Sequence, residues 1–346
     1  MTRLVFITQQ VDPGHPALAA TVPKLRALAQ RVDELVVLAD GAVPGALPQN
    51  ARVRRFAAGT KVGRGLRFEA ALASELRRRP RPDGIVAHMC PIYAVLAAPL
   101  ARPLRVPLVL WYTHWHASPT LRAAAHAATA IASVDRRSFP LRSPKVRAIG
   151  HGIDVDEFPC RQHAAAEELR LLALGRYSPA KGLSVVFRAL RRALDCGTAV
   201  RLSLHGPTLS PLEQAHRAEL ERLVQELRLE DRVALDGPVE RARVPELLAT
   251  HDALVNNMRA GAPDKVVYEA AASCVPVLAS NPVFDTLLPD ELRFERDDPA
   301  QLAERIAELA ALNTEERARH GHALRQKVSR EHSVETWAER ILELAR

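Results

Sequence analysis

Short apolar segments alternate along the chain with longer segments in which apolar residues recur every three or four positions. The short runs indicate buried strands, and the longer period indicates helices that pack on a sheet. The predicted strands are residues 4–8, 32–39, 53–56, 84–88, 108–112, 129–134, 169–174, 200–205, 233–235, 253–256 and 275–279. This alternation predicts an α/β fold built on layered sheets.

Amphipathic segments follow most of these strands and predict the helices that cover the sheets. The predicted helices are residues 17–30, 66–79, 91–101, 183–194, 211–227, 299–312, 315–331 and 334–346, with one more that starts at Asp264. Residues 60–65 lack the Gly-Lys-Ser/Thr ending of a P-loop, so we interpret them as a basic loop. Because 346 residues exceed what one core usually serves, we expect two domains of about 150 to 180 residues.

Composition narrows the class of protein. The longest apolar run, residues 91–101, is shorter than the roughly 20 residues that a membrane span needs. The first ten residues turn polar too early for a signal peptide, which favours a cytoplasmic protein. The four cysteines have neither CxxC nor zinc spacing, so we expect reduced thiols. They are Cys90, Cys160, Cys196 and Cys274.

Charge is unevenly distributed. Residues 1–160 hold 22 lysines and arginines against 11 acidic residues, whereas the remainder holds 26 against 29. A basic N-terminal half favours an acidic acceptor or a peripheral contact with an anionic membrane surface, and the alternative is an arginine-rich solvated face. Nucleic-acid binding is not expected, because no recognition motif or interleaved aromatic residues accompany the charge.

Two segments of the C-terminal half have the residue types that bind phosphate. Arg176 and Lys181 lie five apart at a strand-to-helix turn, where a guanidinium fork and a point charge suit a diphosphate. Residues 257–263 form a turn before the next helix, and the backbone around Gly261, Ala262 and Pro263 can meet a phosphate. Asp264 is expected to cap that helix.

Further candidates follow other strands. Gly14, after the first strand, permits close approach of a ligand. His114 and His116, two apart, are expected on the same side of an extended segment. Three interpretations stay open for the pair: a metal site that needs a third ligand, packing, or a role in a ligand cleft. Asp154 and Asp156 are interpreted as turn residues rather than a metal-binding pair, and we expect no bound metal.

Three motifs together resemble the retaining glycosyltransferases of family 4. They are Gly152-Ile153-Asp154 with Phe158, Gly175-Arg176 with Lys181-Gly182, and Glu269-Ala270 with Val275-Pro276-Val277. The resemblance implies the GT-B fold, in which two Rossmann-like domains face each other across a cleft. It implies an acceptor-side domain at residues 1–155, a nucleotide-sugar domain at 156–330, and a C-terminal helix at 331–346 that returns to the first domain.

The resemblance also assigns roles to residues. Arg176 and Lys181 hold the donor diphosphate, together with Gly14 and the turn at Gly261, Ala262 and Pro263. Glu269 holds the ribose, and Lys265, Gly206 and Val239 lie near the sugar or nucleobase. The family's first signature glutamate falls at Gly261, so Asp264 is expected to substitute for it. A histidine, His114 or His116, orients the donor or the acceptor.

The implied activity is transfer of a sugar from a nucleoside diphosphate sugar to an acceptor hydroxyl, with retention of configuration. No cofactor or metal is expected, because the cations can stabilise the leaving diphosphate. Two alternatives stay open: a nucleotide-sugar epimerase of the same fold, and a non-catalytic protein that binds nucleotide sugars or polyanions.

Overall fold

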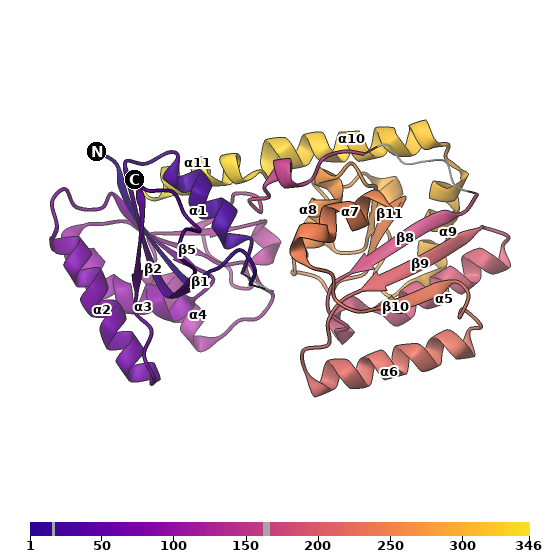
Figure 1. Ribbon diagram of the computed structural model, residues 1–346, viewed down its shortest axis with the longest axis horizontal. Helices are drawn as coiled ribbons and strands as arrows, with labels where there is room; N and C mark the ends of the chain where they lie inside the picture. Colours follow the sequence, from indigo (N-terminus) through magenta and orange to yellow (C-terminus); the bar gives the residue numbers. More distant parts are fainter. Residues whose placement is uncertain (16–17, 162–166) are drawn as a thin grey trace. The chain divides into compact units, whose positions relative to one another are not determined.

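The computed structural model describes residues 1–15, 18–161 and 167–346, so residue 17, where the first predicted helix starts, lies outside the described residues. The chain divides into two compact units. Unit 1 is Met1–Asp154 with Glu331–Arg346, and unit 2 is Val155–Arg330. Each unit is a parallel sheet with helices on its faces, so the predicted α/β class is confirmed (Figure 1).

Unit 1 contains a seven-stranded parallel sheet in the order β3-β2-β1-β4-β5-β6-β7. Its strands are β1 (Arg3–Val11), β2 (Glu34–Ala42), β3 (Ala51–Arg55), β4 (Gly84–His88), β5 (Leu108–Trp111), β6 (Ala130–Ser133) and β7 (Val146–Ala148). Its helices are α1 (Thr21–Ala29), α2 (Lys61–Arg77), α3 (Pro91–Ala101), α4 (Pro119–Ala127) and α11 (Val334–Leu344).

Alternate residues of β1 serve two cores. Val5 and Ile7 join the apolar cluster formed with α2, α3 and α4, whereas Phe6 makes an edge contact with Trp337 of α11. Trp337 is fully buried and also packs edge-on against Trp111 of β5. The last helix thus contributes a buried tryptophan to the core on one face of the unit 1 sheet, which explains why residues 331–346 group with unit 1.

Unit 2 contains a five-stranded parallel sheet in the order β10-β9-β8-β11-β12. Its strands are β8 (Leu169–Leu174), β9 (Val200–His205), β10 (Val233–Asp236), β11 (Ala253–Asn256) and β12 (Val277–Ala279). Its helices are α5 (Leu183–Asp195), α6 (Pro211–Glu226), α7 (Val244–Ala249), α8 (Lys265–Ala272), α9 (Pro299–Ala311) and α10 (Thr314–Glu331).

Residues 60–65 were predicted as a loop, and this prediction is wrong. Thr60 is the N-cap of α2 and its hydroxyl accepts from the Gly63 amide, so the helix starts at Lys61. The cap stabilises a helix start that contains two glycines, Gly63 and Gly65, and that would be weak without it.

Among the described residues, no helix has both the length and the apolar character needed to cross a membrane.

The prediction of four reduced cysteines is also wrong. Cys160 and Cys274 form a disulfide although 114 residues separate them, and their Cα atoms lie 5.1 Å apart. That spacing is normal for a disulfide. Cys90 and Cys196 are free thiols. The pairing depends on which segments the fold brings together, and residue spacing along the chain does not reveal it.

Candidate functional site

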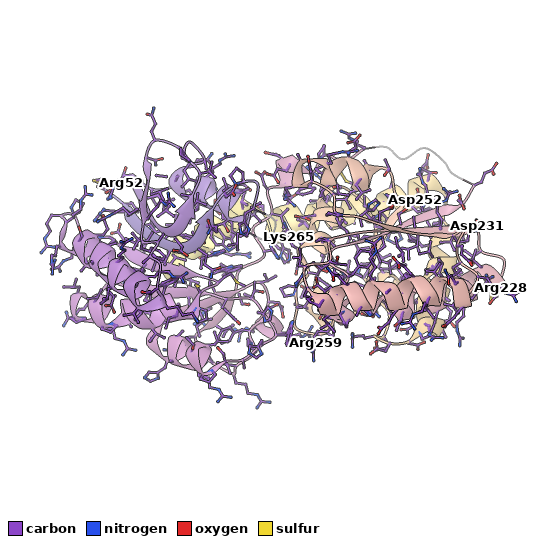
Figure 2. The ribbon with its side chains drawn as sticks, turned by 60° about the horizontal axis from the view of Figure 1, so that its bottom comes forward. Arg52, Arg228, Asp231, Asp252, Arg259 and Lys265 are labelled. Atoms are coloured by element: carbon purple, nitrogen blue, oxygen red, sulfur yellow. A yellow bond between two sulfur atoms is a disulfide. The ribbon has the colours of Figure 1, made fainter. Side chains whose placement is uncertain are left out.

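The carboxyl ends of the parallel strands in unit 2 meet at one edge of the sheet, and polar residues gather there. Gly175 follows β8, Asn257 follows β11, and Ser280 with Asn281 follows β12. In open parallel sheets, ligands bind at this edge. Arg259 and Lys265, labelled in Figure 2, belong to the loop and helix that follow β11 at this edge.

Lys181 and Asp264 form the ion pair at the centre of this edge. Lys181 Nζ lies 2.6 Å from Asp264 Oδ2 and 2.9 Å from the Leu174 carbonyl oxygen. Asn256 Nδ2 also donates to Asp264 Oδ2, at 2.8 Å. An ammonium has three N–H donors, and these two bonds use two of them. The third can therefore donate to a ligand oxygen.

The prediction that Asp264 caps α8 is wrong. Asp264 occupies the N-cap position, but its side chain makes no capping hydrogen bond within the described parts of the chain and turns to Lys181 instead. Burial alone would raise the pKa of Asp264, but the Lys181 ammonium and the bonds from Lys181 and Asn256 lower it. The carboxylate stays ionised near neutral pH, and the first-turn amides of α8 keep their capacity to bind an anion.

The buried side chain of Asn281 fixes the loop that precedes α8. Its Nδ2 donates to the carbonyl oxygens of Arg259 and Ala262, at 3.0 and 2.8 Å. Its Oδ1 accepts from the Gly261 amide at 3.4 Å, and Gly261 has the left-handed φ of 81° that glycine adopts readily. The backbone of the loop that contains Pro263 is therefore held by the Asn281 side chain before any ligand binds.

A second pair of polar side chains joins the two segments that the sequence predicted to bind phosphate. Ser280 Oγ donates to Asn257 Oδ1 at 2.7 Å, and Asn257 Nδ2 donates to the Gly182 carbonyl oxygen at 3.1 Å. The Arg259 amide donates to the carbonyl oxygen of Ala180 at 2.9 Å. These bonds connect the turn that carries Lys181 with the loop before α8.

Glu269 lies inside a cluster of charges on α8. It is 2% exposed, and its Oε1 contacts Arg241 Nη1 and, at 3.0 Å, Lys265 Nζ. Burial would raise the pKa of Glu269, but the Lys265 and Arg241 charges lower it, so the group is a carboxylate. Arg241 also pairs with Glu157 at 2.9 Å and covers the Phe158 ring. Among the described residues, the contacts that Arg241 and Lys265 make with Glu269 both fall on Oε1, which leaves Oε2 for a ligand.

Arg176 is not brought together with Lys181. Its guanidinium pairs with Glu213 at 3.1 Å, and the side chain is 58% exposed. Glu213 lies in the first turn of α6, where Ser210 is the N-cap and accepts from the Glu213 amide. The two cations that the sequence spacing grouped therefore point to different partners in this structure.

Three further residues were predicted for the site, namely Gly206, Val239 and Gly14. Gly206 meets the loop after β8, because a Cβ atom there would lie 2.0 Å from the Gly175 carbonyl oxygen. Val239 is half-buried in the loop after β10. In unit 1, the Gly14 amide donates to Asp12 Oδ1 at 2.8 Å, so the backbone donor expected for a phosphate is already used.

The histidine pair does not lie on an extended segment, so that prediction is wrong. The chain bends after β5: the His116 amide donates to His114 Nδ1 at 3.0 Å, and the His114 ring stacks on Trp115. Burial, with a smaller effect of His116, lowers the pKa of His114. A neutral His114 that accepts at Nδ1 carries its proton on Nε2. His114 is half-buried and His116 is exposed.

Within residues 1–15, 18–161 and 167–346, neither histidine belongs to a group of side chains that could bind a metal ion. The set of such residues found within the described parts of the chain is Cys160, Cys274 and His322, away from the carboxyl edge of the sheet. Within the described parts of the chain, His114 and His116 therefore lack the third ligand that a metal site would need.

The sequence reasoning missed several polar residues that organise the site. They are Asn256, Asn257, Ser280, Asn281, Arg241 and Glu213. The first four end or directly follow two neighbouring strands, β11 and β12. Polar residues at the ends of buried strands were a readable signal, since parallel strand ends meet at one edge. Arg241 and Glu213 had no such signal.

Comparisons with known proteins agree with this geometry. The family model described as "Glycosyl transferases group 1" matches residues 155–327, half of the chain. No curated protein matches the chain. Among solved structures, Anabaena HepE in complex with UDP and glucose is similar with a TM-score of 0.76 and 20% identity, covering 99% of both chains.

Two further structures share the whole fold. A glycosyltransferase from Rickettsia africae has a TM-score of 0.77 at 12% identity and covers 99% of this chain and 97% of its own. Sucrose-phosphate synthase from Thermosynechococcus elongatus has a TM-score of 0.76 at 18% identity, covering 99% and 98%. With the matching family model, the chain belongs to the group 1 glycosyl transferases and is a glycosyltransferase of the GT-B fold.

Proposed function

We propose that the protein transfers a sugar from a nucleoside diphosphate sugar to an acceptor hydroxyl, with retention of configuration and without a metal ion. The observation that supports this best is the Lys181–Asp264 ion pair on the same sheet edge as buried Glu269. Anabaena HepE has been crystallised with UDP and with UDP-glucose, which makes a uridine diphosphate sugar the first donor to test.

The diphosphate is bound by the positive groups at the N-terminus of α8. Lys181 has one N–H left for a phosphate oxygen, and the first-turn amides of α8 have no side-chain cap among the described residues. Arg176, which is exposed, can exchange Glu213 for a phosphate. As the bond between sugar and diphosphate breaks, negative charge grows on the leaving oxygen, and these donors stabilise it.

The ribose is bound by Glu269. Its Oε2 accepts from the two ribose hydroxyls, while Arg241 and Lys265 hold Oε1 and keep the carboxylate ionised. Asp264 orients Lys181 and contacts the donor sugar in place of the family's glutamate, at whose position this chain has Gly261.

The chemical step needs no separate base. The acceptor oxygen forms a bond to the anomeric carbon on the face that the diphosphate leaves, and the acceptor proton passes to a leaving phosphate oxygen. His114 donates from Nε2 to a hydroxyl of the donor or acceptor, with His116 as the alternative donor.

The test is release of nucleoside diphosphate from a panel of UDP, GDP, ADP and TDP sugars, measured with and without candidate acceptors. Acceptor-dependent release that persists in EDTA supports the proposal. Donor conversion without any acceptor would identify an epimerase instead, and tight binding without turnover would identify a binding protein. Activity lost in EDTA and restored by a divalent ion would contradict metal independence.

A further inference from the structure

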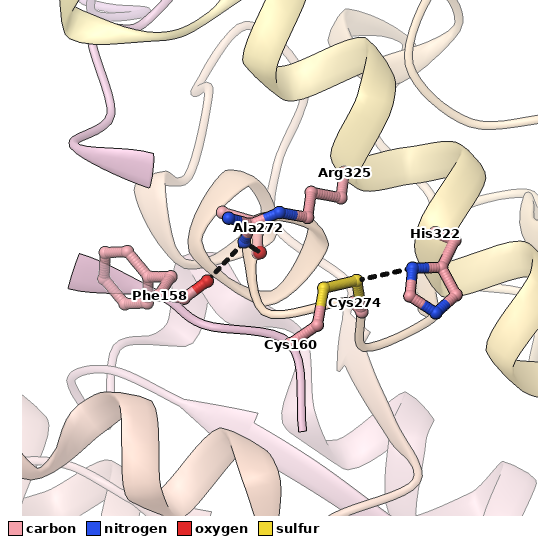
Figure 3. The surroundings of a disulfide bond; sticks show 6 residues. All are labelled: Phe158, Cys160, Ala272, Cys274, His322 and Arg325. Carbon is pink, nitrogen blue, oxygen red and sulfur yellow. Dashed lines mark hydrogen bonds between the residues drawn. A yellow bond between two sulfur atoms is a disulfide. The ribbon is translucent and has the colours of Figure 1, made fainter. Parts of the chain in front are cut away.

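The disulfide between Cys160 and Cys274 lies at the opposite edge of the unit 2 sheet from the nucleotide site. Figure 3 shows it joining the segment after Phe158 to the turn that ends α8. Cys274 comes just before β12, so it lies at the amino end of that strand. The site described above does not use either sulfur.

The backbone at Cys274 is unusual for a residue with a side chain. Cys274 follows the C-cap of α8 and has a left-handed φ of 61°. Its amide donates to the Ala271 carbonyl oxygen, and the Val275 amide donates to that of Ala270, which is the pattern of a Schellman turn. Glycine is preferred at this position, because a Cβ atom disfavours the conformation. The disulfide with Cys160 gives a physical reason for a cysteine at this position.

Helix α10 brings three residues onto this turn. Gly321 allows the close approach, since a Cβ atom there would lie 1.8 Å from the Cys274 carbonyl oxygen. Arg325 donates to the carbonyl oxygens of Phe158 and Ala272, so the two segments stay connected without the sulfur bond (Figure 3). His322 completes the set, with Nδ1 at 3.3 Å from Cys274 Sγ.

The two sulfurs differ in access and in partners. Cys274 is 5% exposed and has the His322 contact, whereas Cys160 is half-buried. Both line a cavity of about 400 Å³, together with Arg161, Arg317 and His322. A reagent that enters this cavity meets Cys160 as the more accessible sulfur.

We propose that Cys160, Cys274 and His322 form a reversible thiol–disulfide exchange site that reacts with a dithiol. The thiolate of the dithiol attacks Cys160 Sγ, a new sulfur–sulfur bond forms, and the bond to Cys274 breaks. Cys274 leaves with the electron pair as a thiolate, which the neighbouring His322 imidazole stabilises. A better stabilised leaving thiolate speeds the exchange.

The second thiol of the reagent then displaces Cys160. The chain ends with two thiols, which receive the two protons of the dithiol, and the reagent ends as a cyclic disulfide. Arg325 preserves the contact between the two segments in the reduced form, so reduction does not unfold unit 2. The oxidised reagent reverses both steps.

The test uses the native full-length chain and dithiothreitol as the dithiol. Free thiols are counted over time, and the expected number rises from the two of Cys90 and Cys196 to four without denaturant. His322→Gln is expected to slow this rise about five- to tenfold. His320→Gln, on the same helix and next to Glu291, is the matched control and is expected to react at the wild-type rate.

A second measurement does not depend on any variant. The wild-type chain is exposed briefly to a monothiol and acid-quenched, and its peptides are mapped by mass spectrometry. We expect the mixed disulfide on Cys160. A mixed disulfide on Cys274, reduction only in denaturant, or wild-type rates in a folded His322→Gln protein would each overturn the proposal.

Discussion

Lys181 Nζ lies 2.6 Å from Asp264 Oδ2 although 83 positions separate the two residues in the sequence. The lysine comes from the turn after β8 and the aspartate from the N-terminus of α8. The carboxylate holds the ammonium against the Leu174 carbonyl and leaves one donor free. The pair thereby turns a flexible lysine into a fixed positive charge at the sheet edge.

Lys181→Ala is expected to weaken nucleoside diphosphate binding more than Arg176→Ala. Losing a hydrogen bond to a charged group costs about 1.5 to 3 kcal/mol, a factor of about 10 to 150 in affinity. Arg176 is exposed and must exchange Glu213, so its loss is expected to cost less. Calorimetry with UDP measures both, with Arg191→Ala as a control that removes a cation of the same unit. Equal affinity of wild type and Lys181→Ala would contradict the diphosphate assignment.

Asp264→Asn is expected to lower turnover about tenfold or more while changing affinity for the bare nucleoside diphosphate much less. The substitution keeps the shape of the side chain but removes the charge proposed to contact the donor sugar, whereas the contacts to the diphosphate and the ribose remain. Helix stability should not change through capping, because Asp264 makes no capping bond among the described residues and Asn caps about equally well. Steady-state kinetics and thermal unfolding are compared. Near wild-type turnover would leave donor sugar recognition to other groups.

Glu269→Gln is expected to reduce binding of a ribonucleoside diphosphate but not of its 2′,3′-dideoxy analogue. The carboxylate accepts from the ribose hydroxyls in the proposed complex, and the analogue lacks them. Glu269→Gln also removes a buried charge that Arg241 and Lys265 face, so unfolding must be checked in parallel. An equal loss of affinity for both nucleotides in a folded variant would rule out the ribose role.

Unit 1 has its own buried charge cluster around Glu75. This residue is fully buried and pairs with Arg3, Arg52 and Arg54, while Glu34 accepts from the first two. Burial raises the pKa of Glu75, but the bonds from Arg52 and Arg54 and the charges of Arg52 and Arg3 outweigh it and lower the pKa to about 2. The carboxylate is therefore more stable in the folded chain than in the unfolded one.

Stability is expected to fall in acid because of this cluster. The contribution of Glu75 is fully present above the unfolded pKa near 4.5 and is lost as the pH falls through about 2. Glu75→Gln should lower the free energy of unfolding by about 3 to 5 kcal/mol at neutral pH. It should also make this free energy depend less on pH in acid. Denaturant unfolding between pH 2 and 7 measures this, with half-buried Glu69→Gln on the same helix as the control. A control that loses as much would point to the helix rather than the cluster.

The basic N-terminal half is proposed to contact an acidic acceptor or an anionic membrane surface. The start of α2 exposes Val62 by 75% and Leu66 by 62%, and Lys61 and Arg67 are exposed beside them. Binding to anionic vesicles is expected to weaken steeply with salt, because exposed charges are screened over about 8 Å at physiological ionic strength. It should also weaken in Val62→Ser/Leu66→Ser.

The matched control for that experiment is Leu209→Ser/Leu212→Ser, which removes two equally exposed leucines from unit 2. Co-sedimentation with vesicles gives the readout. If the wild-type chain does not bind the vesicles at low salt, the proposed contact with a membrane surface is wrong. If both double variants lose the same amount of vesicle binding, α2 has no specific role in it.

Much of the fold follows from the sequence because its signals are local. Apolar runs predicted strands at residues 84–88 and 253–256, which are β4 (Gly84–His88) and β11 (Ala253–Asn256), since burial of both faces of a parallel sheet requires such runs. The three motifs also indicated a glycosyltransferase, which the matching model of the group 1 glycosyl transferases confirms, whereas family 4 stays a prediction.

Other features depended on contacts between distant residues. Periodicity located Asp264 at a helix start, but whether it caps that helix or holds Lys181 depends on which strand lies next to β11. Arg176 was grouped with Lys181 by spacing, yet Glu213 of α6 takes its guanidinium. The segment with the two histidines after β5 was predicted to be extended. In the structure it bends, and the His116 amide donates to His114 Nδ1.

The disulfide shows the same division most clearly. The sequence by itself determined where Cys160 and Cys274 lie relative to the predicted elements, one after the Phe158 motif and one before a buried strand. Only the tertiary structure decided that they meet, because α8 must end in a left-handed turn and α10 must pack on it through Gly321. Local patterns fix the elements, whereas side-chain partners 83 or 114 residues apart are set by how those elements pack.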